Sequence, residues 1–447
     1  MKYLLVAATG AALFIASCHG KNDYADITHD PDLYAKTVHQ LNTVVMGNNF
    51  SPIVGSRNYL YANVAAYEVI AAAHPETYNS LAGQLKDLPP VPRPDMTKKA
   101  DYNFAALLAF CKLGEAVTFP AGSLQEYVDS LKQLVSDHGM PADVLANTVA
   151  YADTVSSVIM AWSKKDHYAQ SRSFPKYNVI DTPGRWVPTP PAYTSAMEPH
   201  WNQIRTLVMD SATQFIPPAP YTFNISDKKS DYYKEVIAIK NAVDSLTPEQ
   251  KHIADFWDDN PFKLNVSGHV MFGTKKFSPP GHWMSIVGIA AKTAHADYAT
   301  TVRAYAITSI ALFDAFIQCW DEKYRHNTVR PETVINKYMD PNWRPYLQTP
   351  PFPEYTCGHS TCSAAAAEAL TSVFGDHLAY TDSTEMEFGI ANRSYKSFRD
   401  AAIENNWARF YGGIHFHRSC VVSTEYGKKV GELVVSKVRM TRPLGSK

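Results

Sequence analysis

Five basic side chains in the last third of the chain could together hold a charged oxyanion. They are Lys323, Arg330, His359, Arg409 and His415. Lysine and arginine offset the charge of an oxyanion and donate hydrogen bonds to its oxygens. A histidine can bond the central atom or move a proton near neutral pH. This set of residue types predicts a site for a tetrahedral oxyanion at which a proton is transferred.

A short turn around Gly358 adds a second feature of an anion site. Residues 355–360, Tyr-Thr-Cys-Gly-His-Ser, precede an alanine-rich stretch that we predict to be helical as far as Phe374. The first N–H groups of a helix have no partner within it, and the positive end of the helix dipole lies there. Alone, such a turn is equally typical of an ordinary capped helix. Beside the five basic residues, it favours a bound anion.

Three segments of this region resemble, in order, the three-part signature shared by vanadium-dependent haloperoxidases and the type 2 phosphatidic acid phosphatase superfamily. They are Lys323 to Arg330-Pro331, Gly358-His359, and Arg409 to His415. Other segments resemble the bacterial haloperoxidase branch in particular; they cover residues 256–259, 279–283 and 314–324. The chain length and the helical N-terminal half are also similar to that branch.

The resemblance implies which residues hold a vanadate cofactor. Lys323, Arg330 and Arg409 would bind its equatorial oxygens, and the Gly358 N–H would add a hydrogen bond. Cys357 stands where the family has a serine and is the remaining candidate for vanadate or phosphate binding. A thiol is a weaker hydrogen-bond donor than a hydroxyl and is open to oxidation by peroxide.

The same resemblance implies that both site histidines are catalytic. His415 would be the axial ligand of vanadium, and His359 would be the acid–base residue. Trp320 and Phe352 match aromatic positions near the halide in chloroperoxidase-like members. Many members have an aspartate four residues after the ligand histidine, where this chain has Ser419. The sequence therefore leaves open which residue fixes the tautomer of the ligand histidine.

The activity implied by the resemblance is oxidation of a halide by hydrogen peroxide to a hypohalous acid. Vanadate would act as a Lewis acid without changing its oxidation state. Iodide is the expected halide because it is the easiest to oxidise. The alternative is a phosphomonoesterase in which His415 attacks phosphorus and His359 protonates the leaving group. The signature residues fit both, because vanadate and a phosphoryl transition state share geometry and charge. A surface protein without catalysis is disfavoured by the intact set of basic residues.

The N-terminus predicts export and lipidation. Lys2 precedes an apolar stretch that is too short to cross a membrane, as in a signal peptide. Ile15-Ala16-Ser17-Cys18 resembles the bacterial lipobox, which implies a signal peptide over residues 1–17 and a lipid on Cys18. A plain secretory signal cut near Ala16 or Gly20 is the alternative. We expect residues 18–31 to be a tether, with the protein anchored by lipid in the bacterial cell envelope.

Charge and cysteine content limit the partners. The net charge is −1, so the chain has no basic excess for nucleic acid. Apart from Cys18, five cysteines remain, an odd number that leaves at least one unpaired. Their spacing shows no zinc pattern, and we expect mostly buried, free thiols. The only membrane contact expected is the lipid anchor, and the sequence does not indicate an oligomeric state.

The elements that position these residues predict an all-α fold of two related helical bundles. Arg57-x-Tyr59 is followed by Val64-Ala65 and an aromatic-acid pair, and Arg303-x-Tyr305 is followed by Ile310-Ala311 and a similar pair at the same offsets. This internal similarity favours an N-terminal bundle over residues 32–215 and a C-terminal bundle over residues 216–447. Only the second carries the basic set, so we place the active site there.

Several helix boundaries are predicted from period and capping residues. Residues 298–320 are apolar almost all round, which predicts a helix in the protein centre. We also expect a short helix over residues 201–214, one long helix from Ser383 or Thr384 to about Phe410, and a last helix from Ile414 to Lys437. No alternation typical of strands is evident.

Four other polar residues are weaker candidates for the site. His326 lies within the first signature segment, and His282 follows a proline pair; we expect each to be structural more often than functional. Asp258 and Asp259 could pair with an arginine of the site or equally could be solvent-facing caps.

Overall fold

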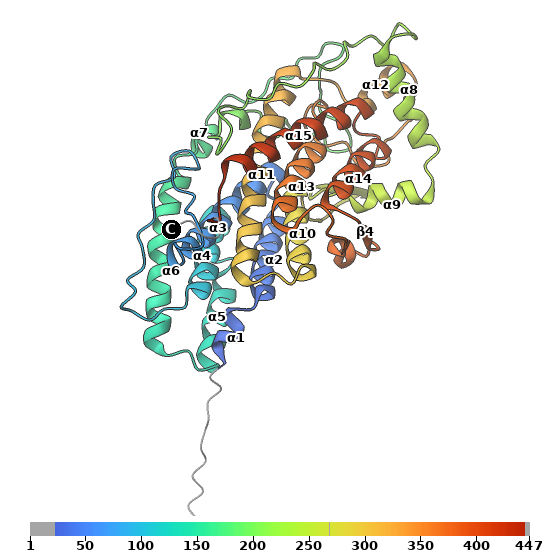
Figure 1. Cartoon of the computed structure of the whole chain (residues 1–447). Helices are drawn as coiled ribbons and strands as arrows, with labels where there is room; N and C mark the ends of the chain where they lie inside the picture. The colour runs from blue at the N-terminus through green and yellow to red at the C-terminus, as the bar shows by residue number, and fades with distance from the viewer. Residues whose placement is uncertain (1–22, 268, 443–447) are drawn as a thin grey trace, which may run out of the picture.

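The computed structural model describes residues 23–267 and 269–442 and is mostly helical (Figure 1). The predicted signal peptide and Cys18 lie outside these residues. Residues 23–31 of the predicted tether pack on the body of the protein. The backbone N–H groups of Asp23 and Tyr24 donate to the carbonyl of His138 at 3.1 and 3.2 Å, and Thr28 is buried. Any tether therefore ends before residue 23.

The N-terminal half is built from helices whose caps follow the sequence. Ser51 accepts a hydrogen bond from the Val54 N–H, and Pro52 occupies the first helical position, as expected for a capped start. The elements are α1 (Tyr24–Thr28), α2 (Pro31–Gly47), α3 (Pro52–Ala73), α4 (Tyr102–Val117), α5 (Gln125–Asp137), α6 (Ala142–Ser163), α7 (Tyr168–Ser171) and the 3-10 turn η1 (Trp201–Gln203).

The C-terminal half contains further helices and two short hairpins. Its elements are α8 (Asp231–Asp244), α9 (Pro248–Phe256), β1 (Lys263–Ser267), β2 (Val270–Thr274), α10 (Pro279–Thr293), α11 (Tyr298–His326), α12 (Pro331–Tyr338), α13 (Gly358–Phe374), β3 (Tyr380–Asp382), η2 (Thr384–Phe388), β4 (Arg393–Tyr395), α14 (Phe398–Tyr411) and α15 (His417–Lys437). Thr247 and Gln250 form a capping box at the start of α9.

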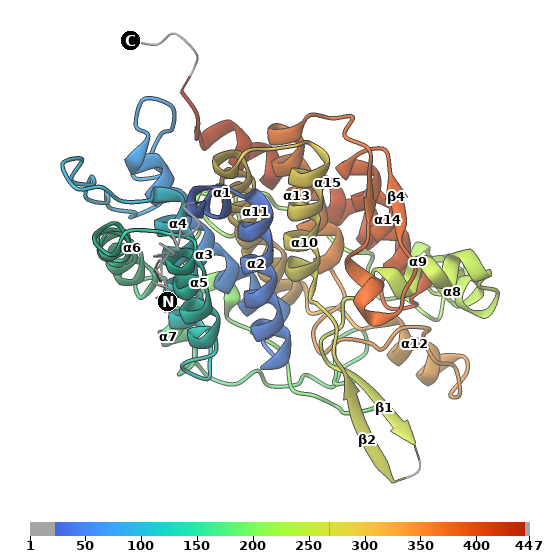
Figure 2. The ribbon, with the colours of Figure 1, turned by 90° about the horizontal axis from the view of Figure 1, so that it is seen from below.

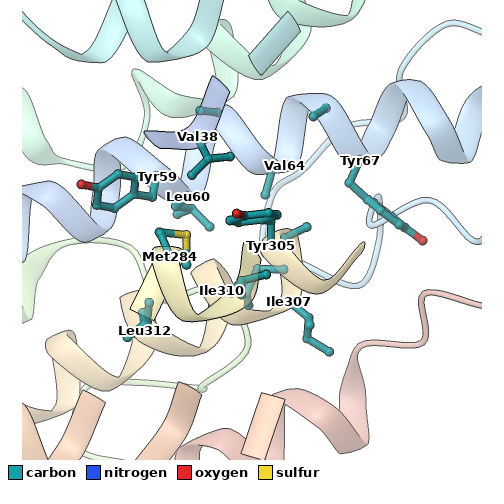
Figure 3. Close-up of a cluster of buried hydrophobic side chains, with 14 of the residues drawn as sticks. Val38, Tyr59, Leu60, Val64, Tyr67, Met284, Tyr305, Ile307, Ile310 and Leu312 are labelled. Carbon is teal, nitrogen blue, oxygen red and sulfur yellow. The ribbon is translucent and has the colours of Figure 1, made fainter. Parts of the chain in front are cut away.

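The centre of the molecule is the long helix α11, as its apolar sequence predicts. Figure 3 shows side chains of α2, α3, α10 and α11 meeting in one buried cluster that includes Tyr305, Ile310 and Val64. By length and composition alone, two described helices could cross a membrane, α6 and α11. The most apolar window of α11 is 94% buried inside the protein, which identifies it as a core helix.

The helices pack in two similar sets. In one, α3 lies against α4 and α6; in the other, α11 lies against α13 and α15. The two sets meet where α3 packs on α11 and α2 packs on α10. This arrangement agrees with the internal similarity in the sequence. The boundary between residues 215 and 216 stays a prediction.

The predicted helix from residue 383 to 410 is wrong, because this stretch contains the 3-10 turn η2 and the strand β4 before α14 begins. β3 and β4 pair antiparallel, with Tyr380 opposite Tyr395. Between them, Gly389 has a φ of +77°, which ends η2. The expectation of no strands is likewise wrong in detail, since β1 and β2 form a second hairpin that projects from the body (Figure 2). The strands β3 and β4 have three residues each, too few for alternation to be visible, whereas β1 and β2 have five each.

The predicted helix over residues 201–214 is also wrong beyond its first turn. The buried carboxylate of Asp314 on α11 accepts the N–H groups of Leu207, Val208 and Met209 at 2.7 to 3.0 Å. These N–H groups are therefore not available for helical hydrogen bonds. The last helix begins at His417 rather than at Ile414.

Candidate active site

The ends of four helices bring the predicted residues together between α11, α13 and the α14–α15 connection (Figure 1). Lys323 is in the last turn of α11, Arg330 caps α12, Gly358 begins α13, Arg409 is in the last turn of α14, and His415 lies between α14 and α15. A Cβ on Gly358 would lie 3.3 Å from the Trp320 ring, so glycine lets α13 begin close against α11. The three cations and His415 are buried.

Lys323 is fully buried and bonded only to backbone carbonyls. Its Nζ donates to Pro353 at 2.9 Å, to Glu354 at 3.1 Å and to Thr356. Burial lowers the pKa of Lys323 to about 8, because the charged form has lost its water. The loop before α13 is thereby tied to the end of α11.

Arg330 is also fully buried and keeps one nitrogen unused. Nε donates to the Phe352 carbonyl and Nη1 to the Ile414 carbonyl, both at 2.8 Å, and Nη1 lies 3.1 Å from His415 Nε2. Nη2 is buried without a hydrogen-bond partner. Burial lowers the pKa of Arg330 to about 10. A guanidinium in this state is poised to bind an anion.

Arg409 is held in the same way from the other side. Its Nη1 donates to the carbonyls of Trp257 and Asp258 at 2.7 and 3.2 Å, and its Nε is buried without a partner. Among the described residues, no salt bridge joins Lys323, Arg330 or Arg409 to a carboxylate. The site therefore concentrates positive charge.

Glu354 fixes the orientation of His415, and the sequence analysis missed it. The two residues meet through His415 Nδ1 and Glu354 Oε1 at 3.0 Å. The same oxygen accepts the Phe416 N–H at 3.1 Å, and Oε2 accepts the Ser419 hydroxyl at 3.0 Å. With the proton on Nδ1, the lone pair of Nε2 points toward Arg330. Ser419, which replaces the family's aspartate, thus supports a carboxylate supplied by another segment.

His359 faces a different carboxylate. Its Nε2 lies 3.7 Å from Asp259 Oδ2, and neither atom has a hydrogen-bond partner among the residues that the structure describes. Burial and the nearby Arg409 charge hold the pKa of His359 well below its ordinary value. The imidazole is therefore neutral at neutral pH and able to accept a proton.

Asp259 is anchored by His282, so two of the weaker candidates belong to the site's surroundings. Asp259 Oδ1 lies 2.8 Å from His282 Nδ1, and both side chains are buried. Asp258 is buried as well and lies 3.5 Å from Lys263. Neither aspartate is a solvent-facing cap. His326 points elsewhere: it lies 3.2 Å from Glu322 and packs on Tyr355.

Asp259, His282 and Glu385 also offer three metal-ligand atoms within 4.8 Å of one another. Both nitrogens of His282 already face carboxylates, because Nε2 lies 3.0 Å from Asp382. Lys276 lies 3.6 Å from Glu385. The imidazolium and the lysine thus offset the buried carboxylates without a metal ion.

Cys357 caps α13 with its thiol beside His415. Its N–H donates to Ser423 at 2.8 Å. Burial raises the pKa of the Cys357 thiol, but a hydrogen bond from Cys420 and the neighbouring His415 outweigh it and hold the pKa well below its ordinary value. All five described cysteines are buried and free, as predicted.

Trp320 and Phe352 lie against the cations. Their ring centroids are 5.0 Å apart, and Lys323 Nζ is 5.0 Å from the Phe352 ring and 5.7 Å from the Trp320 ring. The Trp320 indole N–H donates to the Met197 carbonyl at 3.2 Å, which fixes the ring. These residues form an apolar wall next to the basic set; their role toward halide stays a prediction.

The donor set fits vanadate or a similar oxyanion. Arg330 Nη2, Arg409 Nε, His359 Nε2 and the Ser360 hydroxyl are all buried without partners. Buried polar groups are normally satisfied, so a set of unpartnered polar groups near a helix start indicates a place for a ligand.

Comparisons with known proteins agree with this site. A family model described as the VCPO second helical-bundle domain matches residues 303–442. A search of curated protein sequences found no match to the chain. The crystal structure of a bacterial vanadium-dependent iodoperoxidase is 43% identical, with a TM-score of 0.87, and the match covers 93% of this chain and 98% of that one.

Two more distant structures share the fold. The holo form of a bacterial vanadium-dependent chloroperoxidase is 18% identical, with a TM-score of 0.68, and the match covers 94% of this chain and 97% of that one. The apo form is 19% identical, with a TM-score of 0.65, and the match covers 87% of this chain and 94% of that one. Because the identity to the iodoperoxidase extends over nearly the whole length, the chain belongs to the bacterial vanadium-dependent haloperoxidase family.

Proposed function

We propose that the protein is a vanadate-dependent peroxidase that oxidises iodide with hydrogen peroxide to hypoiodous acid. The observation that carries this proposal is the set of buried cations that have unused donors and no carboxylate partner. The set lies with two histidines, of which His415 is bonded to Glu354 and His359 faces Asp259 without a hydrogen bond. The 43% identity to an iodoperoxidase supports iodide as the halide.

The residues that would hold vanadate are Lys323, Arg330, Gly358, Arg409 and His415. When bound, vanadate supplies Lewis-acid activation of hydrogen peroxide at a constant oxidation state. The unused N–H groups of Arg330 and Arg409 would donate to an oxyanion, and Lys323 would add charge while it stays bonded to carbonyls. Glu354 keeps the proton of His415 on Nδ1, so that Nε2 presents its lone pair.

His359 is the residue that moves the proton. Its neutral imidazole accepts a proton from hydrogen peroxide at Nε2, and the carboxylate of Asp259, 3.7 Å away, stabilises the imidazolium that forms. The same nitrogen can return the proton to the hypohalite product. Trp320 and Phe352 would bound the halide path, because both rings lie beside the cations that attract an anion.

We also propose that the protein is exported and anchored by lipid on Cys18, on the strength of residues 1–18. A Cys18→Ser variant should leave the membrane fraction and lose palmitate label while it keeps its specific activity. Equal labelling of the variant and the wild type would contradict the anchor.

The function is tested with purified apo protein, with and without vanadate, in two assays: iodide oxidation by hydrogen peroxide and phosphate-ester hydrolysis. We expect vanadate-dependent iodide oxidation that is lost in His415→Ala. His417→Ala is the matched control, since the His417 ring packs against Trp407 of α14, with ring centroids 4.7 Å apart. Ester hydrolysis that vanadate inhibits would instead identify the phosphatase alternative.

A further inference from the structure

A buried chain of polar groups continues from the acid–base histidine away from the oxyanion site. It runs from His359 through Asp259 and His282 to Asp382. The distances are 3.7 Å from His359 Nε2 to Asp259 Oδ2, 2.8 Å from Asp259 Oδ1 to His282 Nδ1, and 3.0 Å from His282 Nε2 to Asp382 Oδ2. His282 and Asp382 are fully buried, so protein groups rather than solvent fix their positions.

His282 is fixed on its faces as well as at its nitrogens. The Trp257 ring stacks on it at 4.6 Å with planes 18° apart, and Phe256 packs against its edge at 5.4 Å. The main chain of the same segment accepts both hydrogen bonds of Arg409, at Trp257 and Asp258. One imidazole at the start of α10 thus immobilises the segment that contacts both His359 and Arg409.

We propose that His282 is a positioning residue for the acid–base step, holding Asp259 so that its second carboxylate oxygen faces His359. The bond from His282 engages one oxygen of Asp259 and leaves the other, which has no partner, directed at His359. Asp382 holds His282 from the opposite side, and Glu385 lies 3.8 Å from His282 Nδ1. This inference rests on the proposed peroxidase function, in which His359 accepts a proton.

The charge on His282 has a defined consequence for His359. Burial disfavours the imidazolium of His282, but Asp259 and Asp382 outweigh burial and raise its pKa well above the ordinary value. While His282 is charged, it offsets Asp259. The charged or titratable groups that face His359 are Asp259, Arg409, Cys357, His415 and, behind Asp259, His282. Without the His282 charge, the full charge of Asp259 acts on His359 and favours its protonation.

The test is His282→Gln, which keeps an amide donor of similar size but no charge. We expect the acid limb of the kcat/KM–pH profile for iodide oxidation to move up by about one pH unit. Asp382→Asn should move the acid limb in the same direction by less, because this variant lowers the pKa of His282 but keeps the imidazole. His252→Gln is the matched control, since His252 bonds to the Ala391 carbonyl and Arg393, away from Asp259.

A second readout does not need activity. Titration of ¹⁵N-labelled histidines in the apo protein should show the same upward movement for His359 in both variants. If His282→Gln does not fold, Asp382→Asn carries the test alone. Folded variants with unchanged profile and His359 titration would overturn the proposal. If the wild type has no peroxidase activity, the proposed function fails, while the apo titration still decides the role of His282.

Discussion

In the N-terminal half, Arg57 of α3 donates through Nε to Asp166 at 2.6 Å, and in the C-terminal half Arg330 beside α11 has no carboxylate partner. Both guanidiniums are buried. Asp166 also accepts the Tyr61 hydroxyl at 2.8 Å and the Tyr168 N–H at 2.9 Å, so the N-terminal network is complete. The C-terminal network ends in the unused Nη2 of Arg330.

This difference separates structural from functional charge in one fold. A buried charge that is paired and fully bonded specifies the packing of its own region. A buried charge bonded only to neutral groups has lost its water without gaining a counter-ion. Such a charge stabilises the protein only when an anion binds. The pKa of Arg330 falls to about 10 by burial for this reason.

The largest effect is expected where the N-terminal pair is broken. Asp166→Ala leaves Arg57 buried and unpaired, which should lower the free energy of unfolding by about 3–5 kcal/mol. Chemical denaturation measures this loss. Activity per folded molecule should stay near the wild-type value, because no residue of the basic set contacts Asp166. A variant of normal stability would mean that the N-terminal network is not the structural counterpart we describe.

Arg330→Met should show the opposite pattern. Loss of a donor aimed at a developing charge should lower kcat/KM by about 10²–10³-fold, with weaker vanadate binding. The thermal stability of the apo protein should change much less than in Asp166→Ala, because no ion pair is broken. Arg57→Met is the matched control: it should destabilise the protein and keep the activity of the folded fraction. If Arg330→Met and Arg57→Met lost equal stability, Arg330 would be as structural as Arg57, and the contrast between the two halves would be wrong.

The sequence predicted the core helix, the helix that begins at Gly358 and the basic set, because these depend on local signals. The apolar run over residues 298–320 places α11 in the core, and the alanine-rich run after Gly358 places α13. The basic set was recognised because its three sequence motifs follow one another in the order of the family signature. The turn around Gly389 and the hairpins were missed. The strands β3 and β4 have three residues each, too few to show a period, and the short alternation of β1 over Lys263–Ser267 was not interpreted as a strand.

The carboxylates that face the two histidines were not assigned that role from the sequence, because each lies far along the chain from its histidine and the pairing depends on the fold. Glu354 lies in a proline-rich loop without period, yet it is the only charged residue between Arg344 and His359. A lone carboxylate so close to the Gly-His turn is a signal that could have identified it. Asp259 was weighed as a cap, and only the buried contact with His282 shows its place.

Glu354→Gln should have a smaller effect than Arg330→Met. The amide keeps the shape but no longer holds the proton on His415 Nδ1 as a carboxylate does, which should weaken vanadate binding by about 10–100-fold. Equilibrium dialysis of vanadate against the apo protein measures this. Glu68→Gln is the matched control, since Glu68 is a buried carboxylate of the N-terminal half bonded to Ser80 and the Leu81 N–H. Unchanged vanadate binding in Glu354→Gln would show that another group sets the His415 tautomer.

The smallest effect is expected at Cys357, where the site departs from the serine of its family. Hydrogen peroxide oxidises an accessible thiol first to a sulfenic acid, and the added oxygen beside His415 would block the oxyanion site. Cys357→Ser should therefore extend the half-life of activity in millimolar peroxide several-fold, with little change in the initial rate. Cys111→Ala, a buried thiol of the N-terminal half, should not extend it. If Cys357→Ser is inactivated as fast as the wild type, the Cys357 thiol is protected during turnover, and the cause of inactivation lies elsewhere in the site.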